Sequence, residues 1–209
     1  RNSRDHQGWK YMTSSYEIEF GTDGWRGVIA RDFTVENVAR VSRSLARHLK
    51  HSSEGAAAPL VVVGYDARFM SPHFAHTAAA AIRAEGLDVK LSREELPTPA
   101  LSWAVRQQQA DAGVMITASH NPAEWNGIKL KGAYGGTALP DFTAAVEKQL
   151  ASDLACEQPP HIPELLELLT LNPPEGVKVI DPLPAYLEQV QSLSDMTPEM
   201  VSGFYQCLK

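Results

Sequence analysis

The residues best suited to chemistry surround Ser119, in the segment T-A-S-H-N-P. An apolar, β-prone run over residues 113–117 precedes the serine and is typical of a buried strand. Asn121 followed by Pro122 is a helix-start signature, because asparagine caps a first turn and proline fits its first position. The free N–H groups of such a start attract anions, phosphate above all. Lys129 brings a cationic side chain back toward the same loop.

The helix after the serine is expected to be a single turn, because Asn126-Gly127 ends it and a second short strand follows. This pattern has two interpretations. In one, Ser119 and Asn121 only satisfy backbone groups in a connection between two strands. In the other, Ser119 is a nucleophile or a phosphorylated serine held among anion-binding donors. Spacing alone favours the first interpretation.

Four segments resemble the signature elements of one enzyme family. T-A-S-H-N-P followed by N-G-I-K is similar to the phosphoserine loop of the α-D-phosphohexomutases, the phosphoglucomutase/phosphomannomutase family. F-G-T-D-G-W-R-G resembles its N-terminal signature, G-Y-D-A-R followed by Ser71 its G-x-D-x-R-x-x-S segment, and P-T-P its P-T-P element. The four lie in the family's order between residues 18 and 131, and their combination is highly specific.

The resemblance implies an isomerase that interconverts hexose 1-phosphate and hexose 6-phosphate. Phosphorylated Ser119 would give its phosphoryl group to the sugar, and the hexose 1,6-bisphosphate would reorient and return its other phosphate. The resemblance gives catalytic roles to Ser119, His120, Lys129 and Arg26, and substrate contacts to Arg26, Ser119, Asn126 and Lys129. It also implies Mg²⁺ as cofactor, bound to Ser119 through a phosphate oxygen. Phosphoryl transfer depends mainly on positioning and charge neutralisation, which suits these groups.

Some of these residues have ordinary structural roles as alternatives. The forked guanidinium of Arg26 on a glycine-rich loop suits a bidentate phosphate contact, whereas a lone arginine would be a solvated surface charge. His120 suits either a hydrogen bond to phosphate and a proton relay, or bracing of the loop. Asp66 and Arg68 suit either a pair that fixes their own loop or direct catalysis.

Apolar runs alternate with amphipathic segments over residues 16–155, which predicts an α/β domain with helices on both faces of a sheet. The resemblance specifies phosphohexomutase domain I, a three-layer α/β/α sandwich with a mixed, mostly parallel sheet. Ser119 would follow a strand's carboxyl end, the usual ligand side of such sheets. Strands are expected at 17–20, 60–63, 87–91, 113–117 and 128–131, and helices at 35–50, 71–85, 100–109 and 141–152.

The remaining segments are expected to lie outside this domain. Residues 1–15 are polar and read as a disordered leader. Seven prolines between positions 159 and 184 indicate a linker over 156–209, with helices at 164–169 and 183–193 packed on the first domain. The D-x-D-x-D metal loop of the family's second domain is missing from this sequence. We therefore expect a chain that is inactive alone and whose partners are the missing mutase domains 2–4.

Composition argues against several classes of binding partner and indicates the cellular compartment. A net charge of −6 argues against nucleic-acid binding. The sequence shows no signal-peptide pattern and no apolar run long enough to span a membrane, so no membrane partner is expected. Cys156 and Cys207 lie far apart without metal-type spacing, which indicates a reduced, cytoplasmic protein.

Two other functional classes stay open. A serine hydrolase would use Ser119 and His120, but neighbouring residues in an extended segment point to opposite sides, and a G-x-S-x-G elbow is missing. A non-catalytic module derived from the same domain would bind phosphosugars or a partner protein. A coupled mutase assay with and without Mg²⁺ separates the three classes.

Overall fold

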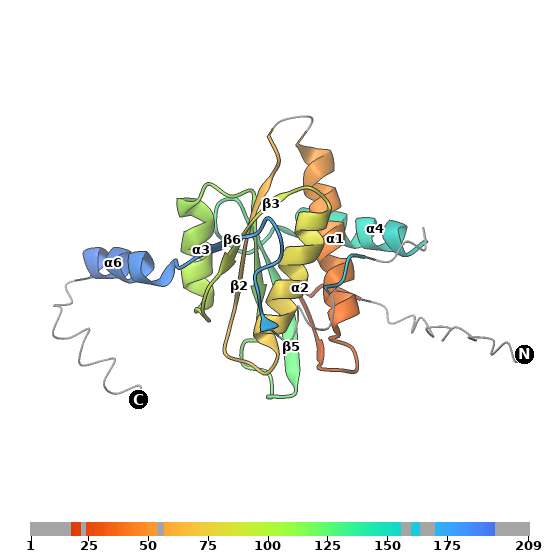
Figure 1. The fold of residues 1–209 in the computed structure, drawn as a ribbon, viewed down its shortest axis with the longest axis horizontal. Helices are drawn as coiled ribbons and strands as arrows, with labels where there is room; N and C mark the ends of the chain where they lie inside the picture. The colour runs from red at the N-terminus through yellow and green to blue at the C-terminus, as the bar shows by residue number, and fades with distance from the viewer. Residues whose placement is uncertain (1–17, 22–23, 54–56, 156–159, 164–169, 195–209) are drawn as a thin grey trace, which may run out of the picture.

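A computed structural model describes residues 18–21, 24–53, 57–155, 160–163 and 170–194 of the chain. Its centre is a six-stranded sheet in the order β1-β5-β4-β2-β3-β6 (Figure 1). Strands β4, β2, β3 and β6 run parallel, whereas β5 is antiparallel to both of its neighbours. The predicted mixed, mostly parallel sheet is confirmed. The strands are β1 (Gly24–Val28), β2 (Leu60–Tyr65), β3 (Asp88–Ser92), β4 (Ala112–Ile116), β5 (Trp125–Gly132) and β6 (Lys178–Ile180).

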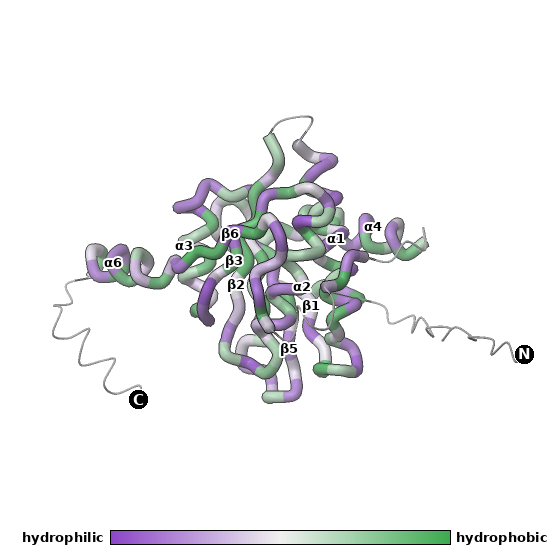
Figure 2. The backbone as a smooth tube through the Cα atoms, viewed as in Figure 1, coloured by the Kyte–Doolittle hydropathy of each residue, from purple (hydrophilic) through white to green (hydrophobic). Residues whose placement is uncertain are grey.

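Helices cover both faces of the sheet, as the continuous apolar strands require. Along β2, Val61 and Val63 join one hydrophobic cluster and Val62 joins the other, because successive side chains point to opposite faces. Helices α1, α2 and α4 pack over the first cluster and α3 over the second, and the central strands between them are largely green in Figure 2. The three-layer sandwich is therefore confirmed. The helices are α1 (Val35–Ser52), α2 (Ser71–Ala84), α3 (Thr98–Gln107), α4 (Pro140–Ala155) and α6 (Leu183–Leu193).

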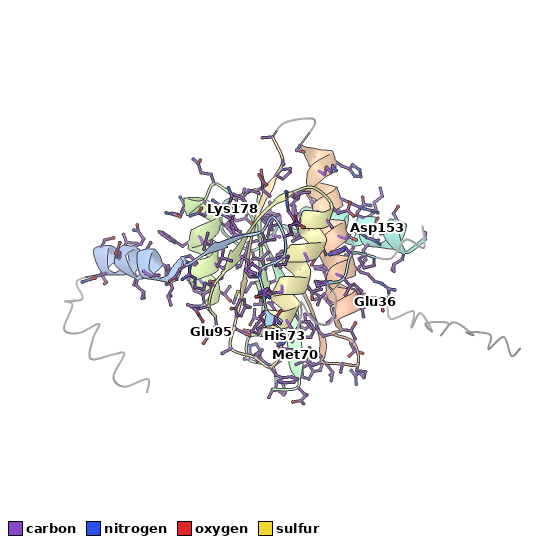
Figure 3. All side chains as sticks on the ribbon, viewed as in Figure 1. Glu36, Met70, His73, Glu95, Asp153 and Lys178 are labelled. Carbon is purple, nitrogen blue, oxygen red and sulfur yellow. The ribbon has the colours of Figure 1, made fainter. Side chains whose placement is uncertain are left out.

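A buried ionic cluster joins α1 to α4. The carboxylate of Asp153, labelled on α4 in Figure 3, accepts hydrogen bonds from Ser44 at 2.8 Å and Arg47 at 2.7 Å, and lies 3.7 Å from the Arg43 guanidinium. Burial by itself would raise the pKa of Asp153, but these hydrogen bonds and the one from Gln149 hold it below its ordinary value. The cluster fixes α4 over the same face of the sheet as α1.

The first predicted strand is wrong for its described residues, since residues 18–20 have no regular structure. The strand lies later, at β1, inside the segment that the sequence suggests is a glycine-rich loop. Pairing with β5 decides this, because β1 aligns residue by residue with it. Trp25 of β1 then stacks on Phe33 with ring centroids 4.8 Å apart, which anchors the strand in the core.

The proline-rich region contributes to the sheet and does not only connect. Strand β6 pairs in parallel with β3. The sequence did not predict this strand, because it is only three residues long and lies among prolines. Helix α6 has the predicted bounds and packs on α3, where Tyr186 contacts Trp103 with centroids 6.3 Å apart. The predicted leader at 1–15 and the helix at 164–169 lie outside the described residues, and the division at 155 stays a prediction. Over the described residues, every helix is too short or too polar to cross a membrane.

Candidate active site

Ser119 is presented on an exposed turn just beyond the carboxyl end of β4. Its backbone is left-handed, with φ of 58°, a conformation that serine adopts only when its surroundings hold it there. The Ser119 N–H donates to the Thr117 hydroxyl at 3.0 Å. His120 is also exposed. The two side chains proposed for catalysis from the sequence are therefore accessible at the ligand side of the sheet.

The segment after Ser119 is a pair of turns and not the predicted one-turn helix. The Asn121 N–H donates to the Ala118 carbonyl and the Trp125 N–H to the Pro122 carbonyl, each at 3.1 Å. These local bonds close the turns, and the first of them uses the Asn121 amide, which the predicted helix start left free for an anion. The reason is that β5 begins already at Trp125, which leaves too few residues for a helix.

Arg68 holds the whole turn region from outside it. Its two terminal nitrogens donate to four backbone carbonyls, those of Ser119 at 2.8 Å, Asn121 at 2.6 Å, Pro122 at 2.9 Å and Trp125 at 3.0 Å. Only 15% of the Arg68 side chain is exposed, and its charge strengthens these bonds, of which those to Asn121 and Trp125 are partly buried. The guanidinium of the G-Y-D-A-R segment thus fixes the path of the serine loop.

Asp66 braces Arg68 and the start of α2 together. Its carboxylate accepts from the Arg68 backbone N–H at 3.1 Å and from the Ser71 hydroxyl at 2.8 Å, and lies 3.5 Å from the Arg68 Nε. The structure thus contains the ion pair between Asp66 and Arg68, one of the two roles that the sequence suggests for them. Met70, between these residues, has a left-handed backbone with φ of 60° and is the N-cap of α2.

Asn126 does not face the ligand side, which corrects the substrate contact expected of it. The residue is completely buried. Its Nδ2 donates to the Ser71 hydroxyl at 3.0 Å and to the Phe69 carbonyl at 3.3 Å, and its Oδ1 accepts from the Gly127 N–H at 2.8 Å. With these contacts made, the side chain ties β5 to the start of α2 and has no exposed surface for a sugar.

Arg26 reaches the serine loop from the edge strand β1. It lies opposite Gly127 of β5, where a Cβ would be 3.0 Å from the Arg26 Cγ and 2.6 Å from the Thr117 carbonyl oxygen. Glycine therefore leaves the path open for the arginine. The Arg26 Nη1 donates to the Asn121 Oδ1 at 3.1 Å, two residues beyond Ser119. The predicted approach of Arg26 to the loop is thus supported by a direct hydrogen bond.

Lys129 lies on the same face of the sheet as Arg26. It follows Gly127 by two positions on β5, and Gly127 pairs with Arg26, so all three share one side. Lys129 is half-buried and pairs with Met115 of β4, which packs on α3. The structure thus brings Arg26 and Lys129 to one face, and the approach of Lys129 to the Ser119 hydroxyl stays a prediction.

Lys131 lies two positions beyond Lys129 on β5 and therefore on the same face of the sheet. It is only 7% exposed. It packs over Gly113, where a Cβ would lie 3.1 Å from the Lys131 Cβ and 2.5 Å from a Val105 methyl. The alternation of side chains along a strand places Lys129 and Lys131 on one face of the sheet. The burial of Lys131 under α3, however, depends on tertiary packing.

The described residues contain no group of three or more His, Cys, Asp or Glu side chains suited to a metal ion. By themselves they do not fit a complete Mg²⁺ site. Ser119, whose side chain is exposed, is the residue predicted to bind the ion through a phosphate oxygen, and this stays a prediction.

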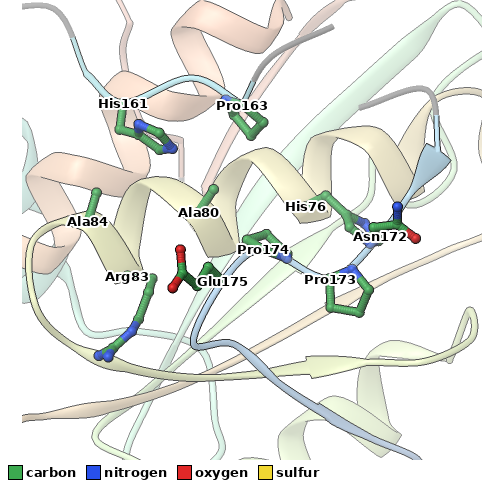
Figure 4. Close-up of a pocket in the computed structure, with 10 residues that line it drawn as sticks. All are labelled: His76, Ala80, Arg83, Ala84, His161, Pro163, Asn172, Pro173, Pro174 and Glu175. Carbon is green, nitrogen blue, oxygen red and sulfur yellow. The ribbon is translucent and has the colours of Figure 1, made fainter. Parts of the chain in front are cut away.

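A separate cleft of about 330 Å³ lies along α2 (Figure 4). Its walls are α2 and residues 161–175 of the proline-rich region, as far as these are described. None of the site residues predicted from the sequence lines it, so it forms no part of the Ser119 site. The lining residues are His76, Ala80, Arg83, Ala84, His161, Pro163, Asn172, Pro173, Pro174 and Glu175.

Comparison with known proteins decides the family. Residues 17–155 match the family model described as phosphoglucomutase/phosphomannomutase, alpha/beta/alpha domain I. The chain belongs to this family. The matched residues of this phosphohexomutase chain include Arg26, Arg68 and Ser119.

Two curated relatives extend the likeness. The phosphohexomutase chain is 35% identical over 191 residues to a phosphoglucomutase of Staphylococcus epidermidis, covering 87% of this chain and 33% of that protein. It is 39% identical over 144 residues to a phosphoglucosamine mutase of Bordetella parapertussis, covering 66% of this chain and 32% of that protein. The chain thus spans about a third of the length of these curated relatives.

A solved structure supports the phosphohexomutase fold. It comes from Thermus thermophilus, and its name places it among the phosphomannomutases. The TM-score is 0.72 at 34% identity, over 86% of this chain and 36% of that one.

Proposed function

We propose that this chain supplies the phosphoserine domain of a phosphohexomutase that interconverts hexose 1-phosphate and hexose 6-phosphate. The observation that carries the proposal is Ser119, an exposed serine in a left-handed turn whose backbone Arg68 holds through four carbonyls. Family membership supports the same reaction class. The relatives' names include glucose and glucosamine phosphates, so the substrate class is a hexose phosphate.

The proposed chemistry is two phosphoryl transfers through one serine. A sugar hydroxyl forms a bond to the phosphorus of phosphorylated Ser119 and loses its proton to a base, and the bond from Ser119 Oγ to phosphorus breaks. The hexose 1,6-bisphosphate then turns around, Ser119 Oγ forms a bond to the phosphorus of its other phosphate, the bond from that phosphorus to the sugar oxygen breaks, and the sugar oxygen takes the proton back from the base. His120, exposed beside the serine, is our candidate for proton transfer.

Positive charge around the serine suits this transfer. Phosphoryl transfer is assisted by fixed groups that stabilise the charge on the transferring oxygens. Arg26 meets this requirement through its hydrogen bond to Asn121 of the loop, and Lys129 shares its face of the sheet. We propose that both stabilise charge on the phosphoserine and on the group in transit.

The proposal includes Mg²⁺, for which this chain would supply one ligand. The ion would supply charge neutralisation at the phosphoserine, where an oxygen of the Ser119 phosphate would be one ligand. Its other ligands would have to come from outside the residues described here. The hexose 1,6-bisphosphate and mutase domains 2–4 are the partners that the proposal requires.

The test uses the complete gene product that carries this chain. Purified parent protein and Ser119→Ala are assayed for conversion of glucose 1-phosphate to glucose 6-phosphate, with Mg²⁺ and a trace of bisphosphate. Intact-mass measurement of both proteins then shows whether the parent carries a phosphate that the Ser119→Ala variant lacks. We expect turnover and the phosphate to vanish together in the variant. Turnover within a few-fold of the parent would overturn the assignment of the serine.

The alternative is a non-catalytic module that binds phosphosugars or a partner protein. The open setting of Ser119 and His120 favours it for this chain alone, because an exposed half-site excludes little water. For the parent and the Ser119→Ala variant, this alternative predicts no turnover. Calorimetry should then detect binding of a sugar phosphate to both proteins.

A further inference from the structure

Arg68 donates four hydrogen bonds to the serine loop from a distant part of the chain, whereas Arg26 donates one to Asn121 and the Ile29 N–H donates one to the Glu124 carbonyl. The hydrogen bonds that the loop makes by itself are local and span two or three residues, such as Ser119 to Thr117 and Asn121 to Ala118. Such short-range bonds close turns without fixing where the turns lie. Arg68 instead comes from the β2–α2 connection, more than fifty positions away in the sequence.

A donor count shows what Arg68 can do. A guanidinium carries five N–H donors, two on each terminal nitrogen and one on Nε. All four terminal donors match a loop carbonyl, with two bonds from Nη1 and two from Nη2. The fifth faces the Asp66 carboxylate at 3.5 Å. Arg68 therefore has no terminal donor left for a phosphate while it holds the loop.

We propose that Arg68 is a positioning residue that keeps Ser119 in its left-handed, exposed conformation. A left-handed backbone is sterically unfavourable for a serine, so the loop relaxes unless outside contacts hold it. The Arg68 Nη2 binds the carbonyl of Ser119 itself and that of Asn121. One nitrogen thus fixes the Ser119–His120 peptide plane and the Asn121–Pro122 peptide plane.

Asp66 extends this role to the start of α2. Its carboxylate orients Arg68 and accepts from Ser71, which in turn accepts from Asn126 of β5. The arginine is held from the side opposite the loop, so its planar fork is already aimed at the carbonyls. A lysine has three donors on one atom and lacks this fork geometry.

Amide hydrogen exchange on the chain itself tests the proposal without substrate. The reporters are the Asn121 and Trp125 amides of the loop, and the Val61–Val63 amides of β2 are the reference for global opening. We expect Arg68→Met to speed loop exchange at least about tenfold relative to the reference, since bonds to a charged group are lost. Arg68→Lys keeps the charge and the stem, so it folds, and it should restore part of the protection and leave at least about a threefold increase.

Arg47→Met is the matched control, because Arg47 also loses ion pairs, with Glu85 and Asp153, but on α1 away from the loop. It should change loop and reference exchange together. The proposal is overturned if loop exchange changes only as much as exchange of the β2 reference amides in both Arg68→Met and Arg68→Lys. If Arg68→Met does not fold, the same result in Arg68→Lys alone overturns it.

The catalytic consequence rests on the proposed function. In the complete protein, Arg68→Lys should lower kcat with KM within about threefold, because it misplaces the serine and removes no sugar contact. A faster-exchanging loop in a protein without mutase turnover would leave the positioning role standing and remove the proposed function. Unchanged exchange in the Arg68 variants together with normal mutase turnover would remove the positioning role and leave the proposed function standing.

Discussion

The Arg26 guanidinium donates to the side-chain oxygen of Asn121 at 3.1 Å, although 95 positions separate the two residues in the sequence. The bond connects the edge strand β1 with the loop that follows β4. It brings a permanent positive charge to within two residues of Ser119, at a place where Gly127 leaves room for the arginine stem. Two arginines therefore contact the same loop, Arg68 through backbone carbonyls and Arg26 through a side chain.

Replacing Arg26 tests whether its charge assists the reaction. In the complete protein, Arg26→Met keeps most of the apolar stem and removes the charge. We expect a loss of about 2–4 kcal/mol in transition-state stabilisation, seen mainly in kcat from steady-state assays. Arg40→Met is the control, since Arg40 forms its ion pair with Glu36 within α1, and it should leave kcat unchanged. An Arg26→Met enzyme with parental kcat would contradict the role.

Lys129 is tested in the same way but with a different control. Lys129→Met should reduce kcat, because the lysine shares the face of Arg26 and its charge would act on the phosphoryl group. Lys148→Met removes an exposed charge on α4 and should have no effect. Lys131 is unsuitable as a control, because its burial makes its replacement a change in stability. A loss of activity of equal size in the Lys129 and Lys148 variants would point to net charge.

The left-handed backbone at Ser119 predicts an unusual order of stabilities. Ser119→Gly should be more stable than Ser119→Ala by about 1 kcal/mol, because glycine adopts positive φ without steric cost. Urea unfolding of the chain, followed by tryptophan fluorescence, measures the difference. The alanine variant should be the more stable one if the loop relaxes to ordinary φ in solution.

Replacing Asn126 distinguishes bracing from substrate binding. Asn126→Ala should cost about 2 kcal/mol of folding stability, because the buried Gly127 N–H loses its acceptor. Asn172→Ala removes an exposed asparagine and serves as the control. The urea midpoints of the variants measure the effect. A raised KM with unchanged stability would instead restore the substrate contact.

Asp153 predicts how acid destabilises the domain. Its folded-state pKa lies below the ordinary value of 3.8, so it stabilises the fold above about pH 4 and loses this effect as pH falls through the folded value. Asp153→Ala should cost about 3–5 kcal/mol at pH 7, because buried Arg43 and the nearby Arg47 each lose an ion pair. Its stability should also change less between pH 5 and pH 3 than the parent's. Asp141→Ala, at the exposed start of α4, should keep the parental acid profile in melting experiments.

Local sequence determined most of the helices and parallel strands. Thr34 caps α1 by accepting a hydrogen bond from the Asn37 N–H, and the apolar run at β2 lies inside the sheet. These features depend on neighbouring residues and on periodicity, which a sequence displays directly. The motif order also identified Ser119 and Arg26 as members of one family signature, and the family match confirms that family.

Tertiary structure decided what the sequence left open. Strand β1 forms inside a glycine-rich segment because β5 pairs with it, and β6 forms because β3 offers a free edge. Neither partner is near in the sequence, so local propensity gave no signal. Burial likewise separates Lys131 from Lys129, which the two-residue period made equivalent.

The roles of the loop residues show the same limit most sharply. The sequence suggests pairing between Asp66 and Arg68, which are two positions apart, and the pairing is present. It could not show that Arg68 binds four carbonyls of a loop that follows a different strand, nor that Asn126 is buried beneath it. Residue types and motif order determined which groups this protein has for chemistry. Long-range packing alone decided which of them face the ligand side and which hold the loop in place, because hydrogen bonds form between atoms that the folded sheet brings together.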